Sequence, residues 1–344
     1  MRPVGSLDAL RREVIERPST GTAPVSWRLD HEVTETVVAL DRPARPALAF
    51  IGAGRAGSAL AQGLANAGYR ISAIHSRTAA HASRLAESTG ADVVATAAAA
   101  AHRAEITFLT VPDGEIVRVA ATIAAAGIAL PGRSLVHCSA THGPAVLAAA
   151  ALTTASLGAF HPLQALAGSG SASLLAGSSF ALQATPPLLT QLQRLVADLG
   201  GHLLDLPPAG RTLYHAAAVL AGNASLALLA RATSLLEEAG VSRPEAHRAL
   251  AALLAGAAAN AIAAGPASAL TGPVVRGDAE TVARHLDALS ADPSTRELYR
   301  RLAYETLSLA GLEGREAVAA ALDTAVSLPP AAAAVSVFPR RRVA

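Results

Sequence analysis

Short apolar runs alternate with stretches of helical spacing between residues 46 and 206. The apolar runs predict strands, and the periodic stretches between them predict helices. Strands separated by short helices are typical of a parallel, doubly wound α/β sheet. The expected strands are Ala47–Ile51, Arg70–His75, Asp92–Ala95, Ile106–Val111, Ser134–Cys138, Ser156–Phe160 and Ser179–Gln183, and the expected helices are Ser58–Ala67, Thr78–Ser88, Glu115–Ala126 and Pro144–Ala151.

The pattern changes at Pro207-Pro208, after which no strand pattern interrupts the helical spacing. Residues 207–327 therefore predict an all-α domain, and residues 328–344 a tail. Residues 1–45 show no clear period and predict a poorly structured extension with one short helix over Leu7–Ile15. The expected helices of the second domain are Arg211–Ala239, Arg243–Ala264, Ala279–Ser290, Ser294–Ala310 and one near Arg315–Val326.

A glycine motif follows the first predicted strand and opens the first predicted helix. A strand, a Gly-x-Gly-x-x-Gly turn and a helix together form the context of a dinucleotide-binding loop, although three glycines alone could make a plain turn. The helix N-terminus would meet the pyrophosphate. The residues expected to contact the cofactor here are Gly52, Ala53, Gly54, Arg55, Ala56 and Gly57.

The second predicted strand ends in Ser76-Arg77-Thr78, where an NAD enzyme would carry an acidic residue for the ribose 2′-hydroxyl. No acidic residue lies between the glycines and Glu87. Hydroxyls and a guanidinium suit the dianionic 2′-phosphate of NADP(H) instead. The alternative is that Arg77 is a solvated residue of the next helix.

Composition narrows the chemistry and the surroundings of the protein. The 344 residues are 51% hydrophobic and only 3% aromatic, so the core must consist mainly of Ala, Leu and Val. A net charge of +2, without basic residues interleaved with aromatics, argues against nucleic acid as a partner. One cysteine, Cys138, and the lack of an apolar signal core predict a cytoplasmic protein.

All basic side chains other than histidine are arginine, because the sequence contains no lysine. A Schiff base is therefore excluded, and His, Tyr, Asp and Glu remain for proton transfer. Long uncharged stretches such as Thr212–Ala230 raise the possibility of a membrane span. Their His, Asn, Gly and Ser residues favour buried helices at a subunit interface instead.

Ligands of open parallel sheets bind beyond the carboxyl ends of the strands, and three such ends carry polar residues. At the first, Val111 and Pro112 should contact the cofactor ribose, while Asp113 should cap the following helix. Ser139 and His161 follow the next two strands. With an intrinsic pKa near working pH, His161 is the main acid/base candidate and Ser139 its assistant. The alternative for His161 is a buried, backbone-bonded histidine, which is the interpretation for His137.

The predicted helical domain adds two groups of polar residues. Tyr214, His215 and Asn223 share one helix, where His215 and Asn223 would lie ~12 Å apart on roughly one side. They could orient a substrate or line a polar seam of the bundle. In the loop Thr271–Asp278, Arg276 could grip a substrate carboxylate with Thr271 beside it, or could pair with a nearby acid. No metal ion is expected.

The motifs GAGRAG, VPDGEI, HCS, FHPLQ, YHAAAVLAGN and TGPVVRGD occur in this order between Pro46 and Leu312. This series resembles a family of bacterial two-domain oxidoreductases, in which a Rossmann-like NADP-binding domain precedes a helical domain of unknown function. The architecture is also similar to pyrroline-5-carboxylate reductase, ketopantoate reductase, the 3-hydroxyacid dehydrogenases and prephenate dehydrogenase. These similarities imply a homodimer with interlocking helical domains and a site in the cleft between domains.

The resemblance also suggests roles for individual residues. Ser139 and His161 are placed like the catalytic serine and histidine of prephenate dehydrogenases, and the Thr271–Asp278 loop like the carboxylate-binding loop of pyrroline-5-carboxylate reductases. Hydroxyacid dehydrogenases and ketopantoate reductases use a catalytic lysine, which this chain lacks. His161 or His215 would have to replace it.

Together these observations predict an NADP(H)-dependent oxidoreductase for a small carbonyl or imine compound that carries a carboxylate. A 2-oxo acid such as ketopantoate is the first expected substrate and a cyclic imino acid the second. The alternatives are a non-catalytic NADP(H) sensor, a prephenate-dehydrogenase-like enzyme, or an oxidoreductase linked to a deazaflavin.

Overall fold

The computed structural model describes residues 45–324, apart from 128, 149–154 and 168. Its contacts divide the chain into the units Met1–Pro46 and Ala47–Ala344, and all the elements described belong to the second. The expected helix Leu7–Ile15, the tail 328–344, all of the extension except Arg45, and the end of the expected helix Pro144–Ala151 lie outside the described residues.

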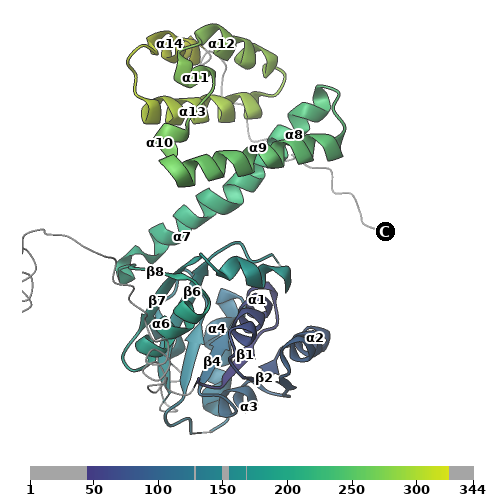
Figure 1. The fold of residues 1–344 in the computed structure, drawn as a ribbon, viewed down its shortest axis with the longest axis vertical. Helices are drawn as coiled ribbons and strands as arrows, with labels where there is room; N and C mark the ends of the chain where they lie inside the picture. The colour runs from purple at the N-terminus through teal and green to yellow at the C-terminus, as the bar shows by residue number, and fades with distance from the viewer. Residues whose placement is uncertain (1–44, 128, 149–154, 168, 325–344) are drawn as a thin grey trace, which may run out of the picture. The chain divides into compact units, whose positions relative to one another are not determined.

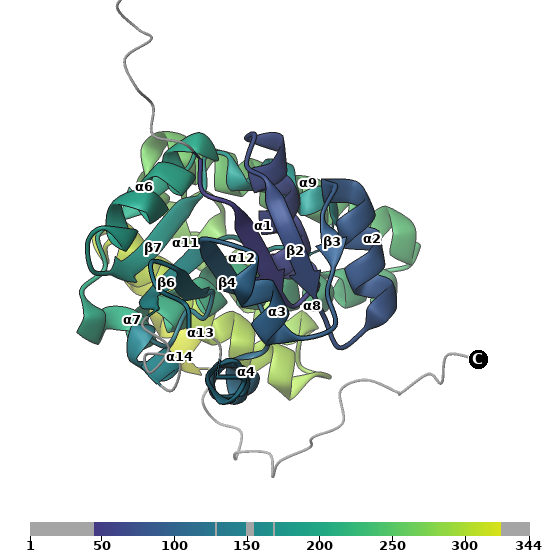
Figure 2. The same cartoon turned by 90° about the horizontal axis from the view of Figure 1, so that it is seen from below.

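Eight strands form one sheet in the order β3-β2-β1-β4-β5-β6-β7-β8 (Figures 1 and 2). All neighbouring pairs are parallel except β6 with β7. This arrangement confirms the expected doubly wound, Rossmann-like sheet. The strands are β1 Leu48–Ile51, β2 Ile71–His75, β3 Asp92–Val93, β4 Ile106–Leu109, β5 Ser134–His137, β6 Ser156–Leu163, β7 Ser179–Ala184 and β8 His202–Leu204.

The antiparallel pair β6–β7 departs from the all-parallel expectation and changes the position of His161. Between these strands the described residues include a 3₁₀ segment, η2 (Ser169–Leu175), and no α-helix that could make a parallel crossover. Strand β6 pairs with β5 only up to Ala159 and continues to Leu163 against β7. His161 therefore lies inside β6, not after its end, but two residues past the last pair with β5.

Two apolar clusters cover opposite faces of the sheet. One packs α1 (Arg55–Asn66), α2 (Ala79–Thr89) and α6 (Leu188–Asp198) on the sheet, and the other packs α3 (Ala97–His102), α4 (Asp113–Ala125) and the 3₁₀ segment η1 (Pro144–Leu147). Helices α3 and α6 and strand β8 were not expected. In the first cluster a row of aromatic rings crosses the strands, with centroid separations of 5.1–5.4 Å, through Phe50, Phe108, Phe160 and Phe180. Four phenylalanines thus supply the bulk that the Ala-rich sequence otherwise lacks.

From β8 to Thr324 the structure contains helices and no further strand. The 3₁₀ turn η3 (Pro208–Gly210) leads into α7 (Arg211–Val219), which continues through a π-helical turn, η4 (Leu220–Ala224), into α8 (Ser225–Glu238). Helix α9 covers Arg243–Ala264 as expected. The remaining helices, of which the short α10 and α11 were not expected, are α10 Pro266–Ala269, α11 Pro273–Arg276, α12 Ala279–Ala288, α13 Pro293–Ala310 and α14 Glu316–Thr324.

The last four helices have a small core of their own. Val282 and Leu286 on α12, Leu307 on α13 and Val318 on α14 are buried together. The carboxylate of Asp278 accepts a hydrogen bond from the Thr281 backbone N–H at 3.0 Å and so caps α12.

The long apolar helices are not buried within one chain. The segments Pro208–Glu238 and Arg243–Ala264 are long and apolar enough to cross a membrane by length and composition, and only 6% of each apolar window is buried. The single chain therefore leaves these helices exposed, and their burial at a subunit interface stays a prediction. Their exposed side chains include Leu213, Leu220, Leu226, Leu253 and Ile262.

Candidate active site

The three glycines of the loop after β1 serve different purposes. A Cβ at Gly57 would lie 2.2 Å from the Gly52 carbonyl oxygen, and one at Gly52, whose φ is +107°, would lie 2.5 Å from the Thr110 carbonyl oxygen. A Cβ at Gly54 would meet no atom within 4 Å. Gly52 and Gly57 are thus required for packing, whereas Gly54 leaves open space where α1 begins. The loop fits a dinucleotide, because a pyrophosphate can approach this open backbone.

Alanine substitutions at Gly57 and Gly54 should therefore affect two different properties, the thermal stability and the NADPH affinity. Gly57→Ala should lower Tm by about 5 °C, since overpacking costs ~1–3 kcal/mol and each kcal/mol shifts Tm by ~2–4 °C. Gly54→Ala should leave Tm of the free protein unchanged and weaken NADPH binding by roughly tenfold or more, because its methyl group would occupy the phosphate approach. Thermal melts and calorimetric titrations measure both effects. A Gly54→Ala protein that binds NADPH normally would contradict this role of the loop.

A cavity of about 380 Å³ opens beside the glycine loop. Its lining brings together the residues predicted at three strand ends, because β1, β2 and β4 are neighbours in the sheet. The predicted residues in the lining are Gly52, Ala53, Gly54, Ser76, Arg77, Thr78, Val111 and Pro112. Five polar residues that no sequence motif indicated line the same cavity from α2, α4 and the position before α3: His81, Thr96, Glu115, Arg118 and Thr122.

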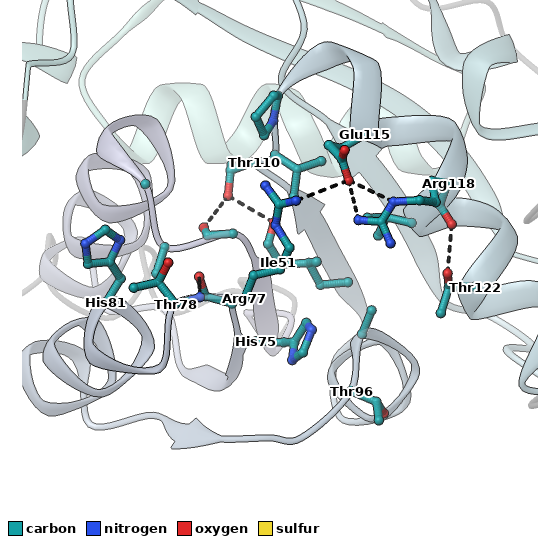
Figure 3. A pocket seen from close by; sticks show the side chains of 18 of the residues that line it. Ile51, His75, Arg77, Thr78, His81, Thr96, Thr110, Glu115, Arg118 and Thr122 are labelled. Carbon is teal, nitrogen blue, oxygen red and sulfur yellow. Dashed lines mark hydrogen bonds and ion pairs between the residues drawn. The ribbon is translucent and has the colours of Figure 1, made fainter.

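The polar wall of this cavity contains two arginines that share one carboxylate (Figure 3). Arg77 reaches from the end of β2 towards α4, and its Nη1 lies 3.7 Å from Glu115 Oε2. Arg118 donates from Nε to the same oxygen at 2.8 Å. The hydrogen bond from Arg118, with the charges of both arginines, lowers the pKa of Glu115. Arg77 is 72% exposed, so a phosphate could replace this weak, screened ion pair.

A second polar cluster lies where β4 and β5 end. Ser139 Oγ donates to Asp113 Oδ2 at 2.8 Å, and Thr141 Oγ1 donates to the same oxygen at 3.1 Å. His142 Nδ1 lies 3.0 Å from Ser139 Oγ. Asp113 was expected to cap α4, and this expectation is wrong: α4 begins at Asp113 after Pro112, and the carboxylate binds the β5 loop instead. Asp113, Thr141 and His142 thus join the predicted Ser139.

His137 and Cys138 beside this cluster have structural roles, as the sequence indicated. His137 is fully buried, with Nε2 3.0 Å from the Gly143 carbonyl oxygen and Nδ1 accepting from the Ser139 N–H. Burial lowers the pKa of His137 to about 4. Burial also raises the pKa of the Cys138 thiol, which keeps it protonated and unreactive.

His161 and Tyr214 form a close pair that joins β6 to α7. His161 Nδ1 lies 2.6 Å from the Tyr214 hydroxyl, and the two rings meet edge to face. Burial, followed by the nearby His215 and Arg211, lowers the pKa of His161 to about 4. The pKa near working pH that the sequence suggested is therefore not retained. Burial raises the pKa of Tyr214 to about 12, so its hydroxyl keeps its proton at neutral pH.

The π-helical turn changes the relation between His215 and Asn223. In a regular α-helix, residues eight positions apart are separated by about 80° around the axis. The wider turn Leu220–Ala224 takes up an extra residue, so eight positions complete close to two turns and both side chains share one face. His215 is close enough to His161 to lower its pKa, whereas none of the described contacts places Asn223 there.

Thr271 and Arg276 belong to a different environment. Thr271 precedes α11, and Arg276 is the last residue of this helix, which packs with α12 and α13. No described contact brings either residue to His161 or Ser139, and Arg276 influences the pKa of Asp278 instead. The described residues also contain no group of three His, Cys, Asp or Glu side chains that could hold a metal ion.

Two family models match the chain in tandem. Residues 47–141 match the model described as NADP oxidoreductase, coenzyme F420-dependent, and residues 178–306 match a domain of unknown function, DUF2520. The chain carries the two domains of the family that its motifs resemble. The family-level prediction of an NADP-type oxidoreductase domain is thereby confirmed. No curated protein matches the chain.

Solved structures share this fold at low sequence identity. A Bacteroides fragilis protein provisionally named an NADP oxidoreductase is 22% identical, with a TM-score of 0.63 over 76% of this chain and 98% of that one. Pyrroline-5-carboxylate reductase from Coxiella burnetii is 15% identical, with a TM-score of 0.52 over 82% and 98%. Reductive aminase from Aspergillus terreus, in complex with NADPH and ethyl-5-oxohexanoate, is 18% identical, with a TM-score of 0.51 over 82% and 94%. Reductases are thus among the proteins with this architecture.

Proposed function

We propose that this protein is an NADP(H)-dependent reductase of a small carbonyl or imine compound that carries a carboxylate. The observation that carries the proposal is the partly buried His161–Tyr214 pair. This proton donor system lies two residues past the last pair of β6 with β5, in a sheet with a dinucleotide-type loop. Reductases of imines and of pyrroline carboxylates share the fold and support the reaction class. A 2-oxo acid remains the first expected substrate and a cyclic imino acid the second.

The glycine loop, the N-terminus of α1 and Ser76-Arg77-Thr78 would hold the cofactor, with Val111 and Pro112 against its ribose. NADPH, when bound, supplies the hydride that the substrate carbon accepts. Arg77 would leave Glu115 for the 2′-phosphate, because a dianionic phosphate is the stronger acceptor for a guanidinium.

The proton would come from the His161–Tyr214 pair. With the Tyr214 hydroxyl donating to Nδ1, neutral His161 carries its own proton on Nε2 and can donate it to the substrate oxygen or nitrogen as charge develops there. The hydroxyl proton of Tyr214 then moves to Nδ1, and water restores it. Ser139, predicted to assist, and His215 and Asn223, predicted to orient the substrate, remain parts of this proposal.

Replacement of Arg77 should weaken the binding of NADPH but not that of NADH. In Arg77→Ala, NADPH affinity should fall about 10- to 100-fold, the value of a charge-assisted hydrogen bond, while NADH affinity stays within twofold. Calorimetric titration with each cofactor measures the change. Arg103→Ala, which removes an exposed arginine that pairs with Asp92 and does not line this cavity, is the matched control. An equal loss for both cofactors would show that Arg77 does not read the 2′-phosphate.

The reaction itself is tested by following NADPH absorbance with a panel of 2-oxo acids and cyclic imino acids. Oxidation of NADPH by at least one of them is expected. Tight NADPH binding with no turnover on any compound would favour the non-catalytic sensor. Failure to bind NADPH would overturn the proposal. The same titration with a deazaflavin cofactor tests the other redox carrier.

We further propose that the exposed apolar faces of α8 and α9 are covered by a second copy of the chain. These faces include an apolar groove lined by Leu228, Leu229, Leu250, Leu253 and Leu254. Large contiguous apolar surfaces are rare on soluble monomers and mark interaction sites. A cytoplasmic homodimer through the helical region, without membrane or nucleic-acid partners, follows from this proposal.

A further inference from the structure

Arg211, the first residue of α7, is a buried cation beside the His161–Tyr214 pair. Arg211 is only 5% exposed, and this burial lowers the pKa of its guanidinium. Nε donates to Gln183 Oε1 at 3.1 Å and Nη1 donates to the Ala140 carbonyl oxygen at 3.4 Å. Both acceptors are neutral. Among the described residues no carboxylate forms an ion pair with this guanidinium.

The surroundings of Arg211 explain why its charge meets no carboxylate among the described residues. It packs against β7 and the loop after β5, which belong to the segment Ser134–Gln193, and that segment contains no Asp, Glu, Lys or Arg. Asp113, the nearest acid of the polar cluster, is bound to Ser139 and Thr141. A buried charge without a counterion is costly, so its retention points to a ligand that supplies the opposite charge.

One nitrogen of the guanidinium is still available. Nη2 forms no hydrogen bond with a described residue. This atom is still accessible to solvent, because among the described residues only Thr107 Oγ1 is both fully buried and without a hydrogen bond. Nη1 at 3.4 Å is weakly held and could turn to a better acceptor. Together the two terminal nitrogens present the fork that binds a carboxylate through two hydrogen bonds.

We propose that Arg211 is the binding site for the substrate's carboxylate, which it holds next to His161 and Tyr214. The proposal rests on the proposed reductase function and deepens it. Tyr214 lies one helical turn after Arg211 and packs with Ala140, whose carbonyl oxygen accepts the hydrogen bond from Arg211. An acid bound here would present its neighbouring carbonyl or imine carbon to the same small region that contains the proton donor. Arg276, which the sequence indicated for this role, lies on α11 and is the competing candidate.

The experiment uses the full chain saturated with NADP⁺, so that a bound oxo acid cannot be reduced. Pyruvate and methyl pyruvate serve as calorimetric probes, since they share a ketone and differ in the carboxylate charge. The wild-type protein should bind pyruvate at least tenfold more tightly than the ester. Arg211→Met should weaken pyruvate binding by roughly a hundredfold and remove this preference, because a hydrogen-bonded charge is lost. Arg211→Lys should lose less, since it keeps the charge without the fork.

Arg276→Met is the matched control and should bind pyruvate like the wild type. NADP⁺ affinity, unchanged in all variants, reports that each of them folds. Wild-type protein that binds NADP⁺ but prefers the ester, or Arg211→Met protein that keeps the preference for pyruvate, would overturn the inference. Loss of the preference in Arg276→Met would transfer the role to Arg276. Wild-type protein that does not bind NADP⁺ would instead overturn the proposed function, so the two failures are distinguishable.

Discussion

Replacement of His161 by alanine should lower kcat about a thousandfold and leave NADPH affinity unchanged. The expected loss lies within the ~10²–10⁴-fold contribution of a positioned acid/base group. His161 makes its described side-chain hydrogen bond to Tyr214, not to the glycine loop, so cofactor binding should not depend on it. Steady-state kinetics with the substrate found in the panel and calorimetry with NADPH measure the two quantities.

Tyr214→Phe provides the companion variant for this experiment. It removes the hydroxyl that lies 2.6 Å from Nδ1 but retains the ring that packs against His161, so kcat should fall by a smaller factor of about ten to a hundred. His137→Ala should lower stability without selective loss of kcat, because that imidazole binds only backbone atoms. Full activity of His161→Ala, or loss of NADPH binding in it, would contradict the assignment.

The pH profile should report the unusual state of His161. Because burial lowers its pKa from 6.5 to about 4, the imidazole is neutral throughout the range from about pH 5 to 8, and kcat should show no acidic limb near 6.5. Activity should fall only as the pH drops through about 4, where protonated Nδ1 can no longer accept from Tyr214. Circular dichroism at each pH separates this loss from unfolding. A limb centred near 6.5 in the wild type would show that His161 is not buried during turnover.

The double substitution Leu253→Glu and Leu254→Glu should convert the protein from a dimer to a monomer. Both side chains lie on α9, line the apolar groove, and are 68% and 36% exposed in the single chain. In the dimer, two carboxylates would lose their hydration at an apolar interface without a positively charged partner. The free energy of this desolvation exceeds the free energy of association of a dimer that forms at micromolar concentration. Sedimentation equilibrium or light scattering measures the change in mass.

Val117→Glu is the matched control for this prediction, because it places the same charge at an exposed apolar position of α4, outside the helical region. It should leave the dimer intact. A wild-type protein that is monomeric, or a double variant that stays dimeric, would overturn the proposed interface. Recovery of the wild type in the membrane fraction, rather than the soluble one, would favour the membrane alternative for α8 and α9.

Local patterns in the sequence predicted much of the fold. The glycine loop, the strands β1, β2, β4 and β5 and the helix α9 lie where apolar periodicity and turn residues placed them, because each depends on neighbours a few positions away. The antiparallel direction of β7 could not be predicted in this way. It depends on the connection from β6, whose composition resembles that of a crossover but includes, in its described part, only a 3₁₀ segment.

The cofactor cavity shows the same division. Ser76, Arg77 and Thr78 could be predicted from their distance after the glycines, which a Rossmann-like fold conserves for geometric reasons. Glu115 and Arg118 have no such signal, since their side chains reach the cavity only when α4 packs beside β4. Asp113 was predicted to cap a helix because sequence patterns indicate only hydrogen bonds between residues that are close along the chain.

By itself, the sequence determined the fold class, the glycine loop with its cofactor preference, and the exclusion of lysine chemistry. Each of these follows from residue types or from spacings within one or two elements. Only the tertiary structure paired His161 with Tyr214, 53 positions away, and Ser139 with Asp113, 26 positions away. Only the tertiary structure placed the Arg211 guanidinium against an uncharged segment of the sheet. Such contacts depend on strand order and helix docking, which bring together residues whose separation along the chain carries no periodic signal.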